Sequence, residues 1–191
     1  MKIIVIDNLT DIAVKGSAPR ITLGADSALL RHSEPLFVDE DYRMRQSVIA
    51  PAVRIGRLGT HIPLKFAEKY IDAHTLFHLY MPPPGMDRSL WGASDRSFSP
   101  GLWLDGNIKA ENTVDVCRRN LDQDCLESGT FTLDIDPGHV AAAVAAISNY
   151  ATLKTGDVFV FTNPALSSEI DRNLQLGVCI NSMNVLDFRI K

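Results

Sequence analysis

Short apolar runs and segments that alternate between apolar and polar residues recur along this chain, and both patterns are typical of strands. The strand-like segments outside the centre of the chain are residues 2–6, 53–58, 130–135, 157–161 and 185–190. Residues 114–119 and 125–127 are two further segments of this kind, and they flank Asn120 and Asp122. Asn and Asp favour turns because their side chains bond to the local backbone, so this pair of segments predicts a hairpin.

Helical patterns are fewer. Asp136 and Pro137 have the residue types that begin helices, and the Ala-rich residues 139–147 follow them. Larger apolar residues spaced three or four apart would face the core: Val140, Val144, Ile147 and Ala151. A second helix is predicted over residues 64–70. Many strands with few helices favour a mainly β (α+β) domain with small helices at its margin.

The middle of the chain, residues 81–112, is expected to be irregular because prolines at 82–84 and 100 interrupt regular elements. It also holds Trp91 and Trp103. These two side chains are compatible with an apolar pocket, with an oligomer contact, or with core packing under a long loop. We interpret residues 81–112 as a loop wrapped on a sheet, within one domain that spans residues 1–191.

Composition narrows the function classes. The chain has 191 residues, of which 46% are hydrophobic and 22% charged, and its net charge of −4 includes no basic stripe. This balance argues against binding to nucleic acid or to an anionic membrane surface, and no apolar run is long enough to span a membrane. Cys117, Cys125 and Cys179 show no metal-binding or disulfide spacing, which indicates a reducing, cytoplasmic setting.

Several segments, in order, resemble the catalytic domain of the fumarylacetoacetate hydrolase family. Residues 25–31, Ala-Asp-Ser-Ala-Leu-Leu-Arg, and the strand-like residues 34–38 resemble the family's Lys-Pro-x-(Ser/Thr)-Ala-Leu segment and the strand after it. Residues 53–59 resemble the strand that carries the family's metal site, and residues 153–158 its Leu-x-x-Gly-Asp signature. Residues 185–190 are similar to its terminal strand. The resemblance implies a partly rolled β-structure with small peripheral helices, and a homodimer.

Members of that family bind Mg²⁺ or Mn²⁺ through a Glu-x-Glu pair and a downstream Asp. The resemblance puts Val48 and Ala50 at the two Glu positions and Leu79 at the Asp position. None of these side chains ligates a metal, and no Asp or Glu lies between Asp41 and Glu68. A hard divalent cation needs several oxygen ligands, so we expect no metal cofactor here.

Other parts of the family's site also depart from its pattern. The N-terminal segment that carries a His and a Glu in the family is reduced to residues 10–20, which contain no His. The family's Thr-Gly-Thr-Pro, which binds a substrate carboxylate, reads Phe-Thr-Asn-Pro, in which Thr162 and Asn163 remain polar. The family's pocket Lys has no counterpart shortly after Trp91.

Two histidines and several acids are candidates for a replacement site. His74 and His78 are four apart, so they lie on one face of a helix or strand and are potential ligands for a transition metal, although no third ligand accompanies them. Asp87, Asp95 and Asp105 could hold a relocated cation, but isolated loop aspartates more often form turns.

The predicted hairpin also brings Cys117 and Cys125 close together. We interpret these two cysteines as small apolar residues of the strands.

The sequence therefore predicts a degenerate relative of the hydrolase family that lacks metal-dependent activity and acts as a small-acid-binding or a structural or regulatory protein. The candidate residues for remaining ligand binding are Asn163, Thr162, His78 and His74. One alternative is an active hydrolase, decarboxylase or isomerase of a dicarbonyl acid with a rearranged metal site. Another is metal-free chemistry built on Asn163, His74 or His78.

Overall fold

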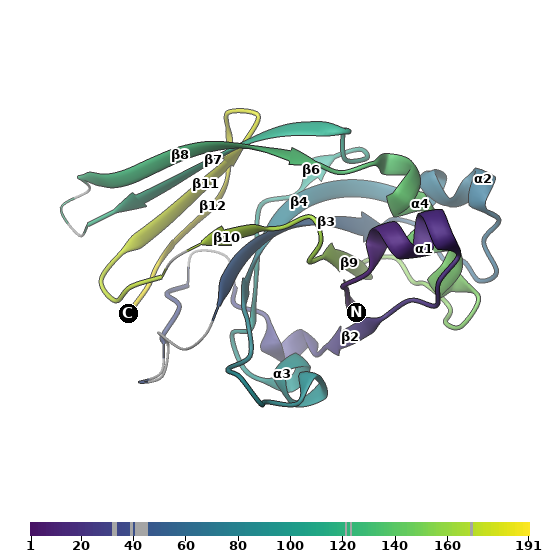
Figure 1. Cartoon of the computed structure of the whole chain (residues 1–191), viewed down its shortest axis with the longest axis horizontal. Coiled ribbons are helices and arrows are strands. Elements are labelled where there is room, and N and C mark those ends of the chain that lie inside the picture. The colour runs from purple at the N-terminus through teal and green to yellow at the C-terminus, as the bar shows by residue number, and fades with distance from the viewer. Residues whose placement is uncertain (32–33, 39, 41–45, 121, 123, 169) are drawn as a thin grey trace.

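An eight-stranded sheet forms the larger part of the molecule (Figure 1). The structure is a computed structural model that describes residues 1–31, 34–38, 40, 46–120, 122, 124–168 and 170–191. The strands of this sheet are β1 (Ile3–Ile6), β2 (Ile21–Gly24), β3 (Ser47–Ile55), β4 (Ile71–Tyr80), β5 (Phe98–Pro100), β6 (Leu104–Asp105), β9 (Val158–Phe161) and β10 (Leu166–Ser168). The main path runs β2-β1-β9-β3-β4-β5, with β10 paired to β3 and β6 paired to β4.

A second sheet of four strands extends from one side of the first (Figure 1). Its order is β12 (Met183–Arg189), β11 (Gln175–Ile180), β7 (Glu111–Arg119) and β8 (Cys125–Asp134), and all neighbours are antiparallel. The inner face of this sheet packs against the larger one through an apolar cluster that includes Leu76, Val178 and Phe188.

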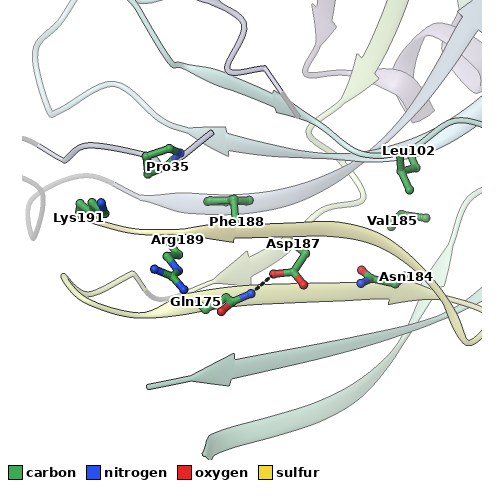
Figure 2. A pocket seen from close by; sticks show the side chains of 9 residues that line it. All are labelled: Pro35, Leu102, Gln175, Asn184, Val185, Asp187, Phe188, Arg189 and Lys191. Atoms are coloured by element: carbon green, nitrogen blue, oxygen red, sulfur yellow. Dashed lines mark hydrogen bonds between the residues drawn. The ribbon is translucent and has the colours of Figure 1, made fainter. Parts of the chain in front are cut away.

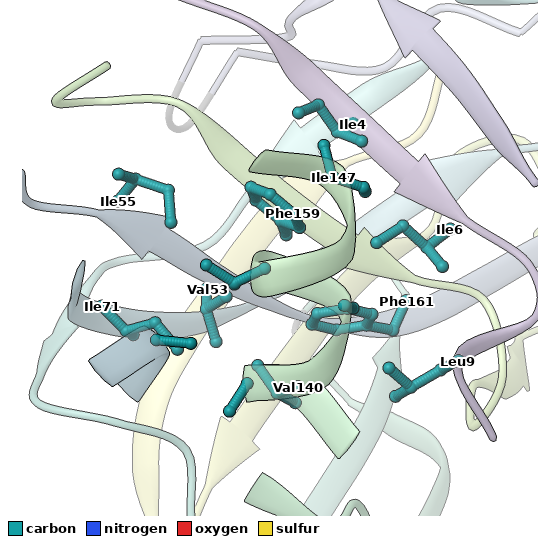
Figure 3. Close-up of a cluster of buried hydrophobic side chains, with 14 of the residues drawn as sticks. Ile4, Ile6, Leu9, Val53, Ile55, Ile71, Val140, Ile147, Phe159 and Phe161 are labelled. Carbon is teal, nitrogen blue, oxygen red and sulfur yellow. The ribbon is translucent and has the colours of Figure 1, made fainter. Parts of the chain in front are cut away.

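Small helices cover the margins of the larger sheet. They are α1 (Leu9–Lys15), η1 (Asp26–Ala28), α2 (Leu64–Ala67), η3 (Glu68–Tyr70), α3 (Arg88–Ala93) and α4 (Pro137–Ser148). The longest, α4, starts at the N-cap Asp136, whose carboxylate accepts the Gly138 amide at 2.7 Å. Its apolar face packs on β1, β3 and β9, as Figure 3 shows for Val140 and Ile147 beside Phe159 and Phe161.

A buried carboxylate fixes β1 beside β9. One oxygen of Asp157 accepts the Lys2 amide at 2.8 Å, and the other accepts the Lys154 amide at 2.8 Å and lies 2.6 Å from the Lys2 ammonium. Burial alone would raise the pKa of Asp157, but its hydrogen bonds and the charge of Lys2 prevail and lower the pKa. These bonds set the start of the parallel β1–β9 pair, in which Ile3 lies opposite Val158.

The two faces of β3 and β4 enter different cores, because side chains alternate along a strand. On one face, Val53 and Ile55 pack under α4, and Ile49 packs under the smaller sheet. On the other face, Ala50 and Ala52 join a third apolar cluster. This second face carries the positions discussed below.

The predicted mainly β class with small outer helices is confirmed. The predicted helices 139–147 and 64–70 correspond to α4 and to the successive α2 and η3, although Ala151 lies beyond the end of α4. Residues 81–112 contain only α3, β5, β6 and the first residues of β7. No helix among the described residues is long and apolar enough to cross a membrane.

Several strand predictions differ in extent from the structure, and the strand-like residues 34–38 form only an isolated bridge of Leu36 with Ile190. The segment 53–58 is the end of β3, which begins at Ser47 and stops at Ile55. The segments 125–127 and 130–135 are one strand, β8, because Gly129 stays within the ladder opposite Val116. The sequence did not indicate β4, since that strand is buried on both faces and therefore lacks alternation.

Candidate functional site

The antiparallel pair β3–β4 brings together the three positions that the family resemblance assigns to metal ligands. Val48 lies directly opposite Leu79, and Ala50 lies opposite Phe77, two residues along the same face. Ala50 and Leu79 are fully buried, whereas Val48 is partly exposed. The three side chains therefore belong to one apolar surface, with only Val48 at its edge.

Aromatic side chains cover this surface. The fully buried Trp91, from α3, donates its indole N–H to the Tyr80 carbonyl at 2.8 Å, and its ring centroid lies 5.0 Å from that of Phe98. Trp103 is partly buried against Phe77, with 6.1 Å between ring centroids. Of the readings left open for the two tryptophans, the structure supports core packing.

These positions do not fit Mg²⁺ or Mn²⁺. Val48, Ala50 and Leu79 offer only carbon atoms, and a carboxylate-free apolar surface does not replace the water that a hard cation must lose. Within the described ranges, no three His, Cys, Asp or Glu residues gather as a metal site would require.

A pocket of about 470 Å³ opens beside Val48. Its lining comes from segments that are distant in sequence: Asp7, Arg20, Gln46, Val48, Met81, Arg88 and Thr162. Two of these residues are apolar, three are charged, and the charged set contains two guanidinium groups and one carboxylate. The pocket thus combines an apolar patch with a positive balance of charge.

Asp7 organises one side of the pocket. One carboxylate oxygen of Asp7 accepts the Thr162 hydroxyl at 2.6 Å and an Arg88 guanidinium N–H at 3.0 Å. The Nε of Arg88 donates to the Thr22 hydroxyl at 2.9 Å, and its guanidinium lies 5.5 Å from the Trp91 ring centroid. Asp7, Thr22 and Trp91 therefore hold Thr162 and Arg88 in place through four contacts.

The start of α3 fixes where the Arg88 side chain begins. Asp87 is the N-cap, and its carboxylate accepts the amides of Ser89 at 2.8 Å and Leu90 at 3.3 Å. These hydrogen bonds, above all the one from Ser89, lower the pKa of Asp87. Asp87 is thus a helix cap, as the turn-forming interpretation of this residue anticipated.

Arg20 approaches the pocket from the start of β2. Its backbone is fixed because its amide donates to the Asn8 side chain at 2.8 Å and its carbonyl accepts the Asp7 amide at 3.2 Å. For the part of the chain that the structure describes, no carboxylate lies within ion-pair distance of the Arg20 guanidinium. This charge remains available to a ligand.

The predicted histidines lie on the opposite face of β4 from Leu79. His78 is fully buried, its Nε2 shares a 2.5 Å hydrogen bond with the Ser47 hydroxyl, and its ring lies 5.1 Å from that of Phe188. Burial lowers the pKa of His78 to about 3. His74 hydrogen-bonds to the Gly106 carbonyl at 2.9 Å through its Nδ1. Neither histidine lines the pocket beside Val48.

Of the four residues proposed for ligand binding, Thr162 alone lines this pocket. Asn163, its neighbour, is exposed and precedes a cis peptide bond to Pro164. The sequence did not single out Asp7, Arg20 or Arg88, because they are isolated charges in three separate segments. Their grouping depends on the pairing of β1 with β2 and on the packing of α3 against β2.

A second pocket, of about 610 Å³, lies over β12 and β11 (Figure 2). Gln175 and Asp187 on its floor are hydrogen-bonded to each other, with Arg189 and Lys191 to one side of them and Asn184 to the other. It contains none of the candidate residues and lies along the edge strand β12, so it is separate from the pocket beside Val48.

We expect His78 to make stability depend on pH. The unfolded chain takes up a proton near the ordinary pKa of 6.5, whereas folded His78 does so only near 3, so stability falls as the pH drops between these values. Replacement by His78→Phe should remove this loss, which is about 1.4 kcal/mol per pH unit. Urea unfolding at pH 7, 5.5 and 4 measures it.

A His139→Gln control should keep the wild-type slope, because His139 is partly exposed on α4. If His78→Phe and wild type lose stability in parallel between pH 6 and 4, the buried neutral state of His78 is wrong.

Comparison by sequence finds no relatives: neither a family model nor a curated protein matches. Comparison of structures does. A fumarylpyruvate hydrolase from Pseudomonas aeruginosa, in complex with Mn²⁺ and pyruvate, is similar with a TM-score of 0.71 and 16% identity over 100% of this chain and 89% of that one.

Two further solved structures are similar over nearly the whole chain. A 2-hydroxyhepta-2,4-diene-1,7-dioate isomerase from Mycobacterium marinum has a TM-score of 0.74 and 16% identity, over 99% of this chain and 73% of that one. A fumarylacetoacetate hydrolase family protein from Yersinia pestis CO92 has a TM-score of 0.69 and 15% identity, over 100% and 93%. The fold of this chain is that of the fumarylacetoacetate hydrolase family.

Proposed function

We propose that this protein binds a small carboxylate, without a metal ion, in the pocket beside Val48. The observation that carries the proposal is the juxtaposition of the Arg20 guanidinium with the apolar Val48 and Met81. A small organic acid has the complementary features, because it joins a carboxylate to a short carbon chain.

The pocket offers a distinct partner for each part of such a ligand. Arg20 can take the carboxylate through two parallel N–H donors, the geometry that makes Arg–carboxylate pairs strong. Thr162 already donates its proton to Asp7, so its oxygen is an acceptor for a ligand hydroxyl. Val48 and Met81 provide contact for the carbon chain.

We propose this binding in place of the metal-dependent hydrolysis of the family. In the family, a metal acts as a Lewis acid on a dicarbonyl acid, and that role needs the carboxylates that Val48, Ala50 and Leu79 lack here. The structural neighbour from Pseudomonas aeruginosa was seen with Mn²⁺ and pyruvate. We propose that this chain kept affinity for the acid and gave up the metal.

We also propose that the protein is a homodimer in a reducing, cytoplasmic setting. Strand β2 is at the edge of the larger sheet, and its outward side chains Ile21 and Leu23 are 45% and 56% exposed. A second copy packed against these two side chains would remove both of them from water.

Pyruvate is the first probe of the binding proposal. We expect calorimetry in EDTA-containing buffer to show saturable binding of pyruvate and none of the neutral pyruvamide. Arg20→Gln should weaken binding at least tenfold, which corresponds to about 1.4 kcal/mol, because it removes the carboxylate partner. The exposed Arg57→Gln is the matched control and should bind as the wild type does.

Equal affinity of the Arg20→Gln variant and the wild type would rule out the assigned carboxylate partner. An absolute requirement for Mn²⁺ would instead favour an active, metal-dependent relative.

Light scattering of the purified chain tests the dimer. We expect the mass of two chains for the wild type and of one chain for Leu23→Lys, because burying a lysine charge in an apolar contact is costly. Leu58→Lys, at a leucine that is 69% exposed outside any strand, should leave the dimer intact. A monomeric wild type at micromolar concentration contradicts the proposal.

A further inference from the structure

All three cysteines point to the outer face of the smaller sheet. Cys117 lies opposite Gly177 in the β7–β11 pair, and Cys179 is two residues from Gly177, so these residues share a face. Cys125 begins β8, the edge strand of the same sheet. Cys125 is exposed, whereas Cys117 and Cys179 are partly exposed. None of them belongs to the pocket beside Val48.

A β-bulge places Cys125 on the same face as Cys117. Cys117 lies opposite Ser128, and regular pairing would put residue 126 opposite Arg119. The register instead shifts there, so Arg119 lies opposite Cys125. Opposite residues share a face, and so do residues two apart in one strand. The shift therefore turns Cys125 toward Cys117, and the two sulfur atoms lie 3.2 Å apart.

The hairpin holds this arrangement without any help from the thiols. The Asn120 amide donates to the Asp124 carbonyl at 3.1 Å, and the Asp124 amide donates to the Asn120 side-chain oxygen at 2.8 Å. The Asn120 side-chain amide also donates to the Asp124 carboxylate at 3.1 Å. The two strands are thus closed just beyond the cysteines, which keeps the two sulfur atoms side by side.

We propose that Cys117 and Cys125 are a redox-active pair that hydrogen peroxide oxidises to an intramolecular disulfide across the β7–β8 hairpin. Figure 1 shows this hairpin at the projecting end of the smaller sheet, and Cys125 is exposed there. In a reducing compartment the pair rests as two thiols, and peroxide stress converts it to the disulfide.

The exposed thiol reacts first. The sulfur of Cys125 attacks one peroxide oxygen, the O–O bond breaks, and hydroxide leaves and is protonated to water, which leaves a sulfenic acid on Cys125. The sulfur of Cys117 then attacks the sulfur of Cys125. The S–O bond of the Cys125 sulfenic acid breaks, and the oxygen leaves as a second water. Two thiols and one peroxide give one disulfide and two waters, so the sulfurs lose two electrons to the peroxide.

Exposure and environment assign these roles. Burial first, and then the neighbouring Cys125 thiol, raise the pKa of Cys117, although the Arg119 guanidinium opposes them. Cys117 is therefore the residue that resolves the sulfenic acid rather than the one that meets the oxidant.

Mass spectrometry of the full chain tests the pair. The protein is reduced, desalted, treated with equimolar hydrogen peroxide and then alkylated with N-ethylmaleimide. We expect a mass loss of about 2 Da before alkylation and alkylation at Cys179 alone, with a peptide that links Cys117 to Cys125. Dithiothreitol should restore alkylation at all three cysteines.

Matched variants make the result decisive. Cys179→Ser should form the same linkage to the same extent, and Cys117→Ser should leave a sulfenic acid on Cys125 that dimedone traps. A linkage through Cys179, or oxidation of wild-type Cys125 to sulfinic acid without disulfide, overturns the proposal. Circular dichroism of each variant confirms that it is folded.

Discussion

The antiparallel pairing of β3 with β4 is the constraint on which the rest of this structure depends. Its register sets Val48 opposite Leu79, and the period-two alternation of both strands sends these side chains to one face and Ser47 and His78 to the other. A shift of one residue would exchange the two faces and bring polar Ser47 and His78 into the apolar cluster around Trp91. Both the closed apolar surface beside the pocket and the buried Ser47–His78 hydrogen bond follow from this register.

Much of the fold could be predicted from local pattern. The helix 139–147 carries its own cap and apolar spacing, and residues 157–161 and 185–190 read as strands because their flanking turns are visible in the sequence. Strand β4 could not be predicted by alternation, since both of its faces are buried. The short α1 was also missed, because its seven residues have little periodicity to read.

Part of the candidate site could likewise be predicted from the sequence, and part could not. The absence of acids at Val48, Ala50 and Leu79 is visible in the sequence, and the structure adds that the three positions lie together. Arg20 and Arg88 are different, because nothing near either residue in sequence marks it. They become neighbours of Thr162 only when β2 pairs with β1 and α3 packs on β2. Cys117 and Cys125 lie side by side because of a β-bulge, and no local pattern in the sequence predicts that bulge.

A small-acid pocket and a metal centre make opposite demands on the surface around Val48, so a measurement of Mn²⁺ binding distinguishes between them. Metal-stripped protein would be titrated with MnCl₂ while the electron paramagnetic resonance signal of free Mn²⁺ is recorded. We expect this signal to grow in proportion to the added metal, because the apolar side chains of Val48, Ala50 and Leu79 bind no Mn²⁺. If one equivalent of Mn²⁺ per chain is missing from the free-ion signal at sub-millimolar concentration, the protein binds the metal and the metal-free proposal is wrong.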